Sequence, residues 1–300
     1  MYYLYTSLKL ERFGTGSGVP TLNRNDIHGF KIPLPTKEEQ EAIAGALSDV
    51  DELISALDGL IEKKRNIKKG AMQELLTGKK RLPGFEKKKG YKQTEIGVIP
   101  EDWDVKQLGE LFDITSSKRV FQSEWKSQGI PFYRARELAV LGECGTVQNE
   151  LFISEEMYRG YKKVYGVPKP GDMLVTGVGT LGKTYVALGD HEFYFKDGNI
   201  IWFKNSGKVS ADYLKQLYLT KLITKQIEDA SAGTTVGTYT ITGAKKTIIP
   251  FPLLGEQNAI ARVLNDMDSE IETLEQKRDK YKSIKQGMMQ ELLTGKTRLV

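Results

Sequence analysis

The sequence is poor in cysteine and histidine, which excludes several kinds of functional site. Its 300 residues include one cysteine, Cys144, and two histidines, His28 and His191. A single cysteine excludes an internal disulfide and any metal cluster held by cysteines. Neither histidine has a carboxylate or cysteine at ligand spacing, so we expect no metal site and no catalysis by paired histidines.

Long apolar runs are also lacking. No apolar stretch approaches the roughly 20 residues that a membrane-spanning helix requires. The N-terminal residues MYYLYTSLKLERFGTGSG lack the charged head, apolar middle and cleavage site of a secretory signal. These absences favour a cytoplasmic location and no membrane partner.

The charge balance is mildly basic. The formal net charge is +5 and the isoelectric point is about 8.9. This excess is compatible with a phosphate-backbone partner, although many ordinary enzymes carry as much. Charge alone therefore leaves the function open.

An internal repeat organises the chain. Residues 33–82 align without a gap onto residues 250–299, at a constant offset of 217, and 26 of the 50 pairs are identical. The strongest match is MQELLTGKKRL (Met72 to Leu82) against MQELLTGKTRL (Met289 to Leu299). This degree of identity indicates a duplication.

Each copy is predicted to be one long helix. After Pro35, Thr36 and Glu39 are spaced as a capping box. The second copy has no such box, so its start is less defined. Both copies end at Leu-Leu-Thr-Gly, where Gly78 and Gly295 stand as C-terminal caps. A helix of about 40 residues would span roughly 60 Å.

The apolar spacing of the repeats favours helix pairing. In the first copy the apolar positions alternate steps of three and four, as in a coiled-coil seam; they are Leu47, Val50, Ile54, Leu57 and Ile61. One such helix could equally lie on a globular core. Two matched copies of this length favour an antiparallel pair.

Between the repeats the residue pattern changes from helical to β-rich. Short β-rich runs separated by glycine and polar turns follow from Tyr91 to about Ile249, with a helix predicted over Asp212 to Ala230. Residues 83–90 form a charged connector bounded by proline and glycine. Residues 1–32 match only the approach to the second repeat.

The stretch Gly177 to Thr184, GVGTLGKT, fits the phosphate-loop pattern G-x-x-x-x-G-K-[ST]. A phosphate loop must open a helix whose N-terminal amides hold the phosphates. The residues that follow are rich in β-formers and are interrupted by Gly189. We therefore predict a glycine-rich hairpin here, and a nucleotide-hydrolysing enzyme is the disfavoured alternative.

Four features resemble the specificity subunit of bacterial type I restriction–modification systems. TEIGVIPEDWDVKQLGEL (Thr94 to Leu111) is similar to the opening of a target-recognition domain of that family. IPFYRARELA and GDMLVTGVGTLGK resemble two internal blocks of the family, and the duplicated helices resemble its spacer helices. Together these features cover nearly the whole chain.

The resemblance implies an α+β fold, in which a mixed α/β recognition domain is joined to two long helices that form an antiparallel coiled coil. It divides the chain into a remnant of a first recognition domain (1–32), a first spacer helix (33–82), a linker (83–90), a complete recognition domain (91–249) and a second spacer helix (250–300).

The resemblance also implies a non-catalytic subunit that reads half of a two-part site in double-stranded DNA. In the family, paired helices dock methyltransferase subunits that carry S-adenosylmethionine, while a motor and nuclease subunit carries ATP. This chain should itself hold no cofactor. It departs from the family in having one complete recognition domain, so a homodimer that restores two is a hypothesis. A scaffold or decoy that no longer reads DNA is the other alternative.

Base and phosphate contacts require cations, amides, hydroxyls and aromatic side chains on an open surface. Arg134 and Arg136 alternate in a predicted strand and should share a face, unless one pairs with Glu137 or Asp172. Solvated charge explains the lysines equally well, and turn structure explains the threonines. The DNA-binding candidates are Lys118, Arg119, Tyr133, Arg134, Arg136, Lys162, Lys163, Thr176, Thr180, Lys183, Thr234, Thr235 and Tyr239.

The nearly unchanged ends of the two repeats predict a shared docking surface for partner subunits, although mutual packing would explain them too. The docking candidates are Met72, Leu75, Leu76, Met289, Leu292 and Leu293.

Overall fold

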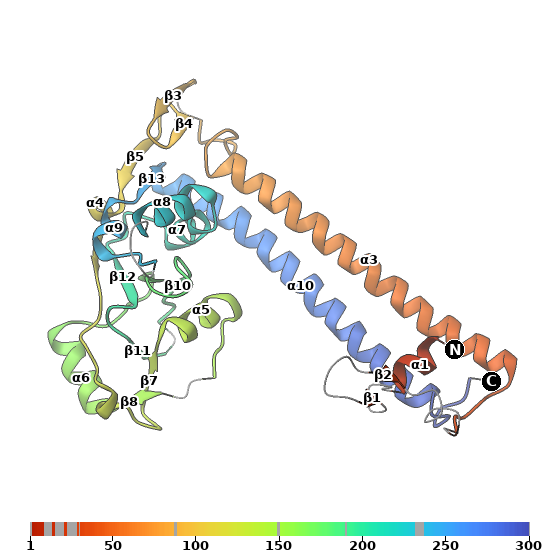
Figure 1. Ribbon diagram of the computed structural model, residues 1–300. Coiled ribbons are helices and arrows are strands. Elements are labelled where there is room, and N and C mark those ends of the chain that lie inside the picture. The colour runs from red at the N-terminus through yellow and green to blue at the C-terminus, as the bar shows by residue number, and fades with distance from the viewer. Residues whose placement is uncertain are drawn as a thin grey trace. The chain divides into compact units, whose positions relative to one another are not determined.

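The computed structural model describes residues 2–8, 14–15, 21–22, 29, 31–86, 89–148, 151–189, 191–231 and 237–299 (Figure 1). The chain forms two compact units. The first comprises Met1–Ile67 and Met267–Val300, and the second comprises Lys68–Asp266. No helix in the described ranges combines the length and apolar character that a bilayer crossing demands.

Two long helices run through the chain at positions related by the repeat. Helix α3 (Lys37–Leu75) and helix α10 (Leu254–Leu292) each contain 39 residues, and both of their ends differ by the repeat offset of 217. Thr36 Oγ1 accepts the Glu39 amide at 3.3 Å, which is half of the predicted capping box. Gly78 and Gly295 end the helices with φ of 70° and 73°. The predicted long helices are therefore confirmed.

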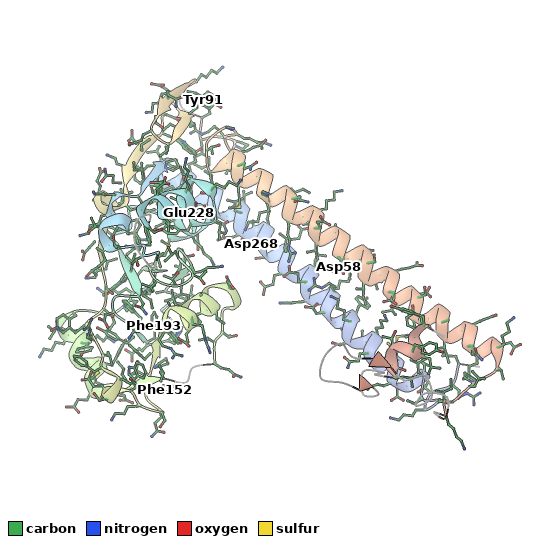
Figure 2. All side chains as sticks on the ribbon, viewed as in Figure 1. Asp58, Tyr91, Phe152, Phe193, Glu228 and Asp268 are labelled. Carbon is green, nitrogen blue, oxygen red and sulfur yellow. The ribbon has the colours of Figure 1, made fainter. Side chains whose placement is uncertain are left out.

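Within the first unit, α3 and α10 pair in antiparallel fashion (Figure 1). Three ion pairs join them, and their residue numbers fall along α3 as they rise along α10, as antiparallel pairing requires. These pairs are Lys64–Glu270, Asp58–Arg278 and Asp51–Lys285. Figure 2 marks Asp58 on α3 and Asp268 on α10. Four of the five predicted seam residues are buried, namely Leu47, Ile54, Leu57 and Ile61, and Val50 is partly buried. The first unit also contains α1 (Tyr2–Ser7) and the antiparallel strands β1 (Gly14–Thr15) and β2 (Thr21–Leu22).

The second unit is built on two small sheets. The four-stranded sheet has the order β10-β9-β12-β6, and the three-stranded sheet has the order β11-β7-β8. Two further strand pairs, β13-β5 and β3-β4, complete the described strands. The bounds are β3 (Tyr91–Thr94), β4 (Gly97–Pro100), β5 (Asp104–Gln107), β6 (Phe112–Thr115), β7 (Ile130–Tyr133), β8 (Phe152–Ile153), β9 (Met173–Thr176), β10 (Thr184–Val186), β11 (Tyr194–Phe195), β12 (Ile200–Asn205) and β13 (Ile248–Phe251).

Short helices cover these sheets. They are α4 (Leu108–Leu111), the 3₁₀ helix η2 (Gln122–Glu124), α5 (Ala135–Cys144), α6 (Glu155–Val164), α7 (Ala211–Tyr218), α8 (Lys221–Ser231) and α9 (Ile241–Lys246). With the long helix pair, this mixed unit confirms the α+β fold class.

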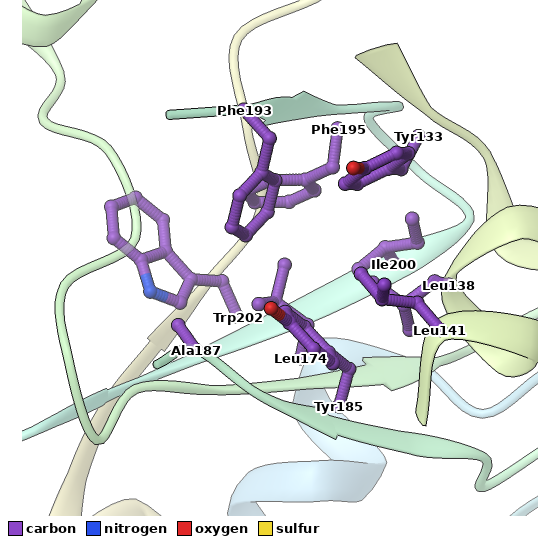
Figure 3. Close-up of a cluster of buried hydrophobic side chains, with 10 residues drawn as sticks. All are labelled: Tyr133, Leu138, Leu141, Leu174, Tyr185, Ala187, Phe193, Phe195, Ile200 and Trp202. Carbon is purple, nitrogen blue, oxygen red and sulfur yellow. The ribbon is translucent and has the colours of Figure 1, made fainter. Parts of the chain in front are cut away.

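An aromatic core holds α5 against the sheets (Figure 3). Phe195 and Trp202 meet edge to face with ring centroids 5.9 Å apart. Close backbone contact also fixes α5, because a Cβ on Gly142 would lie 2.1 Å from the Thr184 carbonyl oxygen. Only glycine permits this approach of helix to strand.

Two local predictions are wrong. The predicted helix over Asp212 to Ala230 is two helices, because α7 ends at Tyr218 and α8 begins at Lys221. At the break, the Thr220 hydroxyl donates to the Leu217 carbonyl at 2.6 Å and so competes with the helical hydrogen bonds. The predicted strand through Arg134 and Arg136 ends at Tyr133, and α5 begins at Ala135.

Candidate nucleic-acid interface

Helix α6 carries the first group of predicted DNA-binding residues. Ser154 caps its N-terminus by accepting the Met157 amide at 3.2 Å. Glu155 and Glu156 lie in the first turn and Lys162 and Lys163 in the last, so both charge pairs suit the helix dipole. Helix capping and the helix dipole, both local effects, therefore account for the position of Lys162 and Lys163 at the C-terminal end of α6.

A loop from β6 brings two further cations to α6. The Tyr161 hydroxyl donates to the Arg119 carbonyl at 3.1 Å, and Lys118 Nζ lies 5.5 Å from the centroid of the Tyr165 ring. Arg119 pairs with Asp197 at 2.9 Å, yet its side chain remains 67% exposed. We define the basic–aromatic face by its residues: Lys118, Arg119, Tyr161, Lys162, Lys163 and Tyr165.

Lys162 has both an acidic and an aromatic neighbour. Its Nζ lies 2.6 Å from Glu192 Oε1 and 5.5 Å from the centroid of the Tyr158 ring. The hydrogen bond from Lys162 lowers the pKa of Glu192, while burial and the nearby Glu192 raise the pKa of Tyr158 to about 12. Exposed pairs of this kind are weak and exchange readily for other anions.

The stretch Gly177 to Thr184 joins antiparallel strands β9 and β10. Thr176 Oγ1 accepts the Lys183 amide at 3.0 Å and donates to the Thr180 carbonyl, which closes the loop. Strand β10 follows where a phosphate loop requires a helix. The hairpin prediction is confirmed. Thr176 is 1% exposed, so its prediction as a DNA contact is wrong.

The two arginines do not share a strand face, which corrects that prediction. Arg134 stands at the N-cap position of α5, with Nη2 2.6 Å from Glu137 Oε1 and Nε 3.0 Å from Glu137 Oε2. Burial would raise the pKa of Glu137, but the hydrogen bonds from Arg134 hold it below its ordinary value. The alternative of a structural salt bridge with Glu137 is confirmed for Arg134. Arg136 is 77% exposed and approaches Glu137 only to 3.5 Å.

The hairpin and α5 enclose a common hollow. It has a volume of about 340 Å³, and its lining includes Arg136, Glu143, Gly179 and Thr180. Lys183 pairs with Glu143 beside it. The structure thus brings Arg136, Thr180 and Lys183 together, and we call these three residues the hairpin group.

Two aromatic candidates are buried, so their prediction as DNA contacts is wrong. Tyr133 is 5% exposed and its hydroxyl lies 3.4 Å from His191 Nε2. Tyr239 is 1% exposed, and its hydroxyl lies 3.1 Å from that of Tyr218 and 2.8 Å from Thr247 Oγ1. Thr234 and Thr235 lie outside the described residues.

Sequence reasoning missed Lys196 and Trp125, which lie at the border of the basic–aromatic face. Lys196 Nζ lies 5.9 Å from the centroid of the Trp125 ring, and Trp125 and Tyr161 pack on the same core cluster. Trp125 Nε1 is buried without a hydrogen-bond partner among the described residues. The aromatic run before Lys196, Tyr194-Phe195, is the signal that could have identified it.

The predicted docking residues fall into two classes. Leu75, Leu76 and Leu292 are buried, although Leu76 also lines a hollow. Met72 and Leu76 line a hollow of about 240 Å³ in the second unit, between the end of α3 and the junction of α7 and α8. Met289 and Leu293 line a hollow of about 630 Å³ in the first unit, between the end of α10 and α1. We call these the helix-end hollows.

Among the described residues, no cluster of histidine, cysteine, aspartate and glutamate could hold a metal ion.

Comparison with known proteins gives one family. The profile of the type I restriction modification DNA specificity domain matches residues 1–66 and 100–282. The chain is 32% identical to the type I restriction enzyme MjaVIII specificity subunit of Methanocaldococcus jannaschii, over 99% of this chain and 70% of that protein. It is 30% identical to the putative MjaX specificity subunit of the same organism, over 93% of this chain and 62% of that protein.

A solved structure supports the fold. The type I restriction–modification S subunit from M. genitalium aligns with a TM-score of 0.59 at 18% identity, covering 97% of this chain and 71% of that one. At this identity the likeness concerns the fold alone.

Proposed function

The chain belongs to the type I restriction modification DNA specificity domain family, and on that premise we propose that its second unit reads double-stranded DNA in a sequence-specific way. The observation that supports this proposal best is family membership together with a described surface on which exposed cations lie against aromatic rings. The scaffold alternative is less favoured, because a scaffold alone would not require exposed cations against aromatic rings in the second unit.

The basic–aromatic face supplies the backbone contacts in this proposal. Lys118, Arg119, Lys162 and Lys163 are exposed. The ion pairs of Arg119 with Asp197 and of Lys162 with Glu192 are exposed on the cation side, so phosphate can replace these carboxylates at small cost. The hairpin group adds Arg136 and Lys183 beside a hollow that admits the edge of a ligand. Arg134 positions α5 and is not a contact.

The test is DNA affinity of the complex reconstituted with its partner subunits. Lys118→Gln with Lys162→Gln should weaken binding at least tenfold and reduce the slope of log affinity against log salt by about 2. The matched control neutralises two other exposed lysines of the same unit, Lys208→Gln with Lys225→Gln. Equal effects of the two pairs would exclude the basic–aromatic face.

The helix-end hollows suit a partner subunit. Each offers methionine and leucine side chains within a polar rim, a composition that favours protein association. We propose that methyltransferase subunits dock there and that a motor and nuclease subunit joins through the complex. Met72→Asp and Leu293→Asp should each release a methyltransferase subunit in pull-down, whereas the exposed Lys79→Asp should not. Retention by both variants would rule out the hollows.

We further propose that the chain is not itself an enzyme and holds no cofactor, with S-adenosylmethionine and ATP bound by partner subunits. Calorimetric titration of the chain with S-adenosylmethionine or with ATP should then give no saturable heat of binding. ATP binding that is lost in Lys183→Ala would restore the phosphate-loop alternative.

The chain spans about two thirds of the length of the relatives it matches. Reading a two-part site requires two recognition domains, which two copies of the chain would supply. Light scattering should therefore show two copies in the DNA complex, and a single copy bound to a two-part site would contradict this arrangement.

A further inference from the structure

Helix α5 divides its side chains between two faces. Leu138 and Leu141 are buried in the aromatic core, toward which they point in Figure 3. Arg136, Val140 and Glu143 follow one another at helical spacing on the opposite side, and all three are exposed. We call these three residues the outer face of α5.

Close packing fixes this face within the second unit. The backbone of α5 meets strand β10, where a Cβ on Gly142 would lie 2.1 Å from the Thr184 carbonyl oxygen. At the start of the helix, Glu137 Oε2 accepts the Arg134 amide at 3.1 Å. A recognition surface on a helix held in this way is more precise than one on a loop.

The hairpin between β9 and β10 flanks the outer face, and the hollow of about 340 Å³ lies between them. At the start of the hairpin, the Gly177 amide donates to the Asn199 carbonyl at 2.8 Å, and the Gly177 carbonyl accepts the Tyr239 amide at 2.9 Å. Near its end, Lys183 pairs with Glu143. Both sides of the hollow are therefore anchored in the same unit.

The outer face combines three kinds of side chain that distinguish base pairs in the major groove. A guanidinium such as that of Arg136 donates two hydrogen bonds to O6 and N7 of guanine, and a carboxylate such as that of Glu143 accepts from N4 of cytosine. The methyl groups of Val140 suit the C5 methyl group of thymine. Phosphate contacts would require neither the acid nor the apolar side chain.

The dimensions of α5 suit the same groove. The major groove is about 12 Å wide and admits an α-helix. Seven residues separate Arg136 from Glu143, which is about 10.5 Å of helix and therefore about three base-pair steps. Arg136 is 77% exposed and approaches Glu137 only to 3.5 Å, so its guanidinium can turn toward a base.

We propose that α5 enters the major groove and that Arg136 and Glu143 determine sequence specificity, Arg136 by reading a guanine and Glu143 by reading a cytosine within about three base pairs of it. This inference rests on the proposed DNA-reading function and deepens it, because it separates base readout by the outer face from phosphate contacts by the basic–aromatic face. The pair of Glu143 with Lys183 opens at small cost, since the two side chains are 58% and 43% exposed.

The experiment selects binding sites from a randomised DNA pool, using the complex of the full chain with its partner subunits. Arg136→Ala should lose a guanine preference of about 5- to 150-fold at one position. Its affinity for non-specific DNA and its salt dependence should stay unchanged, because no phosphate contact is removed. The matched control is Arg159→Ala, which removes an arginine that is 76% exposed and paired with Glu155, and it should keep every preference.

Glu143→Gln gives a second measurement that does not depend on a loss of binding. Because glutamine pairs with N6 and N7 of adenine, the preference at one position should change from cytosine to adenine. A variant that keeps the wild-type preference at every position would overturn the role given to its residue. Equal weakening of selected and non-specific DNA by Arg136→Ala would also overturn the proposal, since it indicates a phosphate contact. A wild-type complex that selects no sequence would refute the proposed function, and the inference with it.

Discussion

At the residue scale, Arg81 holds two carboxylates in a nearly buried site. Burial alone would lower its pKa, but the hydrogen bonds with Asp102 and Glu256 raise it above the ordinary value. Arg81→Ala leaves those carboxylates without a cation, and we expect it to lower the free energy of unfolding by about 3–5 kcal/mol. Denaturant unfolding followed by tryptophan fluorescence measures this loss.

The matched control for Arg81 is Arg159→Ala in the same unit. Arg159 pairs with Glu155 at 2.8 Å, and their side chains are 76% and 64% exposed. Its removal should cost about 0.5 kcal/mol or less. Equal losses of unfolding free energy for the two arginines would show that the buried contacts of Arg81 with Asp102 and Glu256 stabilise the fold no more than an exposed ion pair does.

Glu137 should make the stability of the second unit depend on pH. Its pKa in the folded chain is lowered by Arg134 despite burial, so the ionised form stabilises the fold. That contribution is present above the unfolded pKa of about 4.3 and is lost as the pH falls through the folded value. Wild type should exceed Glu137→Gln in thermal stability at pH 7, and the difference should shrink as the pH falls below the unfolded value of about 4.3.

The control Glu155→Gln removes an exposed carboxylate and should change thermal stability little at either pH. A difference between wild type and Glu137→Gln that persists unchanged at pH 3 would contradict the role of this ion pair.

At the scale of elements, the contact of α5 with β10 depends on one glycine. Gly142→Ala places a methyl group against the Thr184 carbonyl, and we expect a loss of about 1–3 kcal/mol in unfolding free energy. Gly160→Ala is the control in α6, where the methyl group meets nothing within 4 Å. It should be neutral or stabilising by up to about 1 kcal/mol. Similar losses at both glycines would show that the close approach to Thr184 is not the cause.

The antiparallel pairing of α3 and α10 is testable by charge exchange. Lys64 lies 2.6 Å from Glu270 in the first unit. Glu270→Lys places two cations together and should lower the melting temperature, and Lys64→Glu added to it should restore the attraction. A coupling of about 0.5 kcal/mol is expected for such an exposed pair. No rescue in the double variant would contradict the register.

The two long helices could be predicted because their signals are local and doubled. The apolar seam from Leu47 to Ile61, the capping Thr36 and the terminal Gly78 all predict the same helix. The second repeat has a similar seam, and Gly295 stands in the place of Gly78. The change from strand to helix at Arg134 could not be read, because Tyr-Arg-Ala-Arg alternates like a strand. The close approach of Gly142 to Thr184, 42 residues away, decides it instead, and the local ion pair of Arg134 with Glu137 supports the helix start.

The burial of tyrosine side chains could not be predicted from the sequence either. Tyr239 lies beside a glycine-rich loop, which suggested an open surface. Its hydroxyl instead joins those of Tyr218 and Thr247, which are 21 and 8 residues away. Conversely, the phosphate-loop pattern could be rejected from sequence, since the residues after Thr184 are rich in β-formers and are interrupted by Gly189.

At the scale of the whole molecule, duplication presents the same helix end twice. One end, at Gly78 and Arg81, contacts Trp103 of the second unit. The other, at Gly295 and Arg298, has the same left-handed glycine cap. Both ends also border hollows lined by methionine and leucine, which are the sites proposed above for partner subunits.

The central claim is that residues 91–249 choose the DNA sequence. The most direct measurement is mapping of methylated bases produced by the complex of this chain with its methyltransferase partners. We expect one sequence context, and a different context when residues 91–249 are exchanged for the matching region of the MjaVIII relative. Methylation in the same context after that exchange would contradict it.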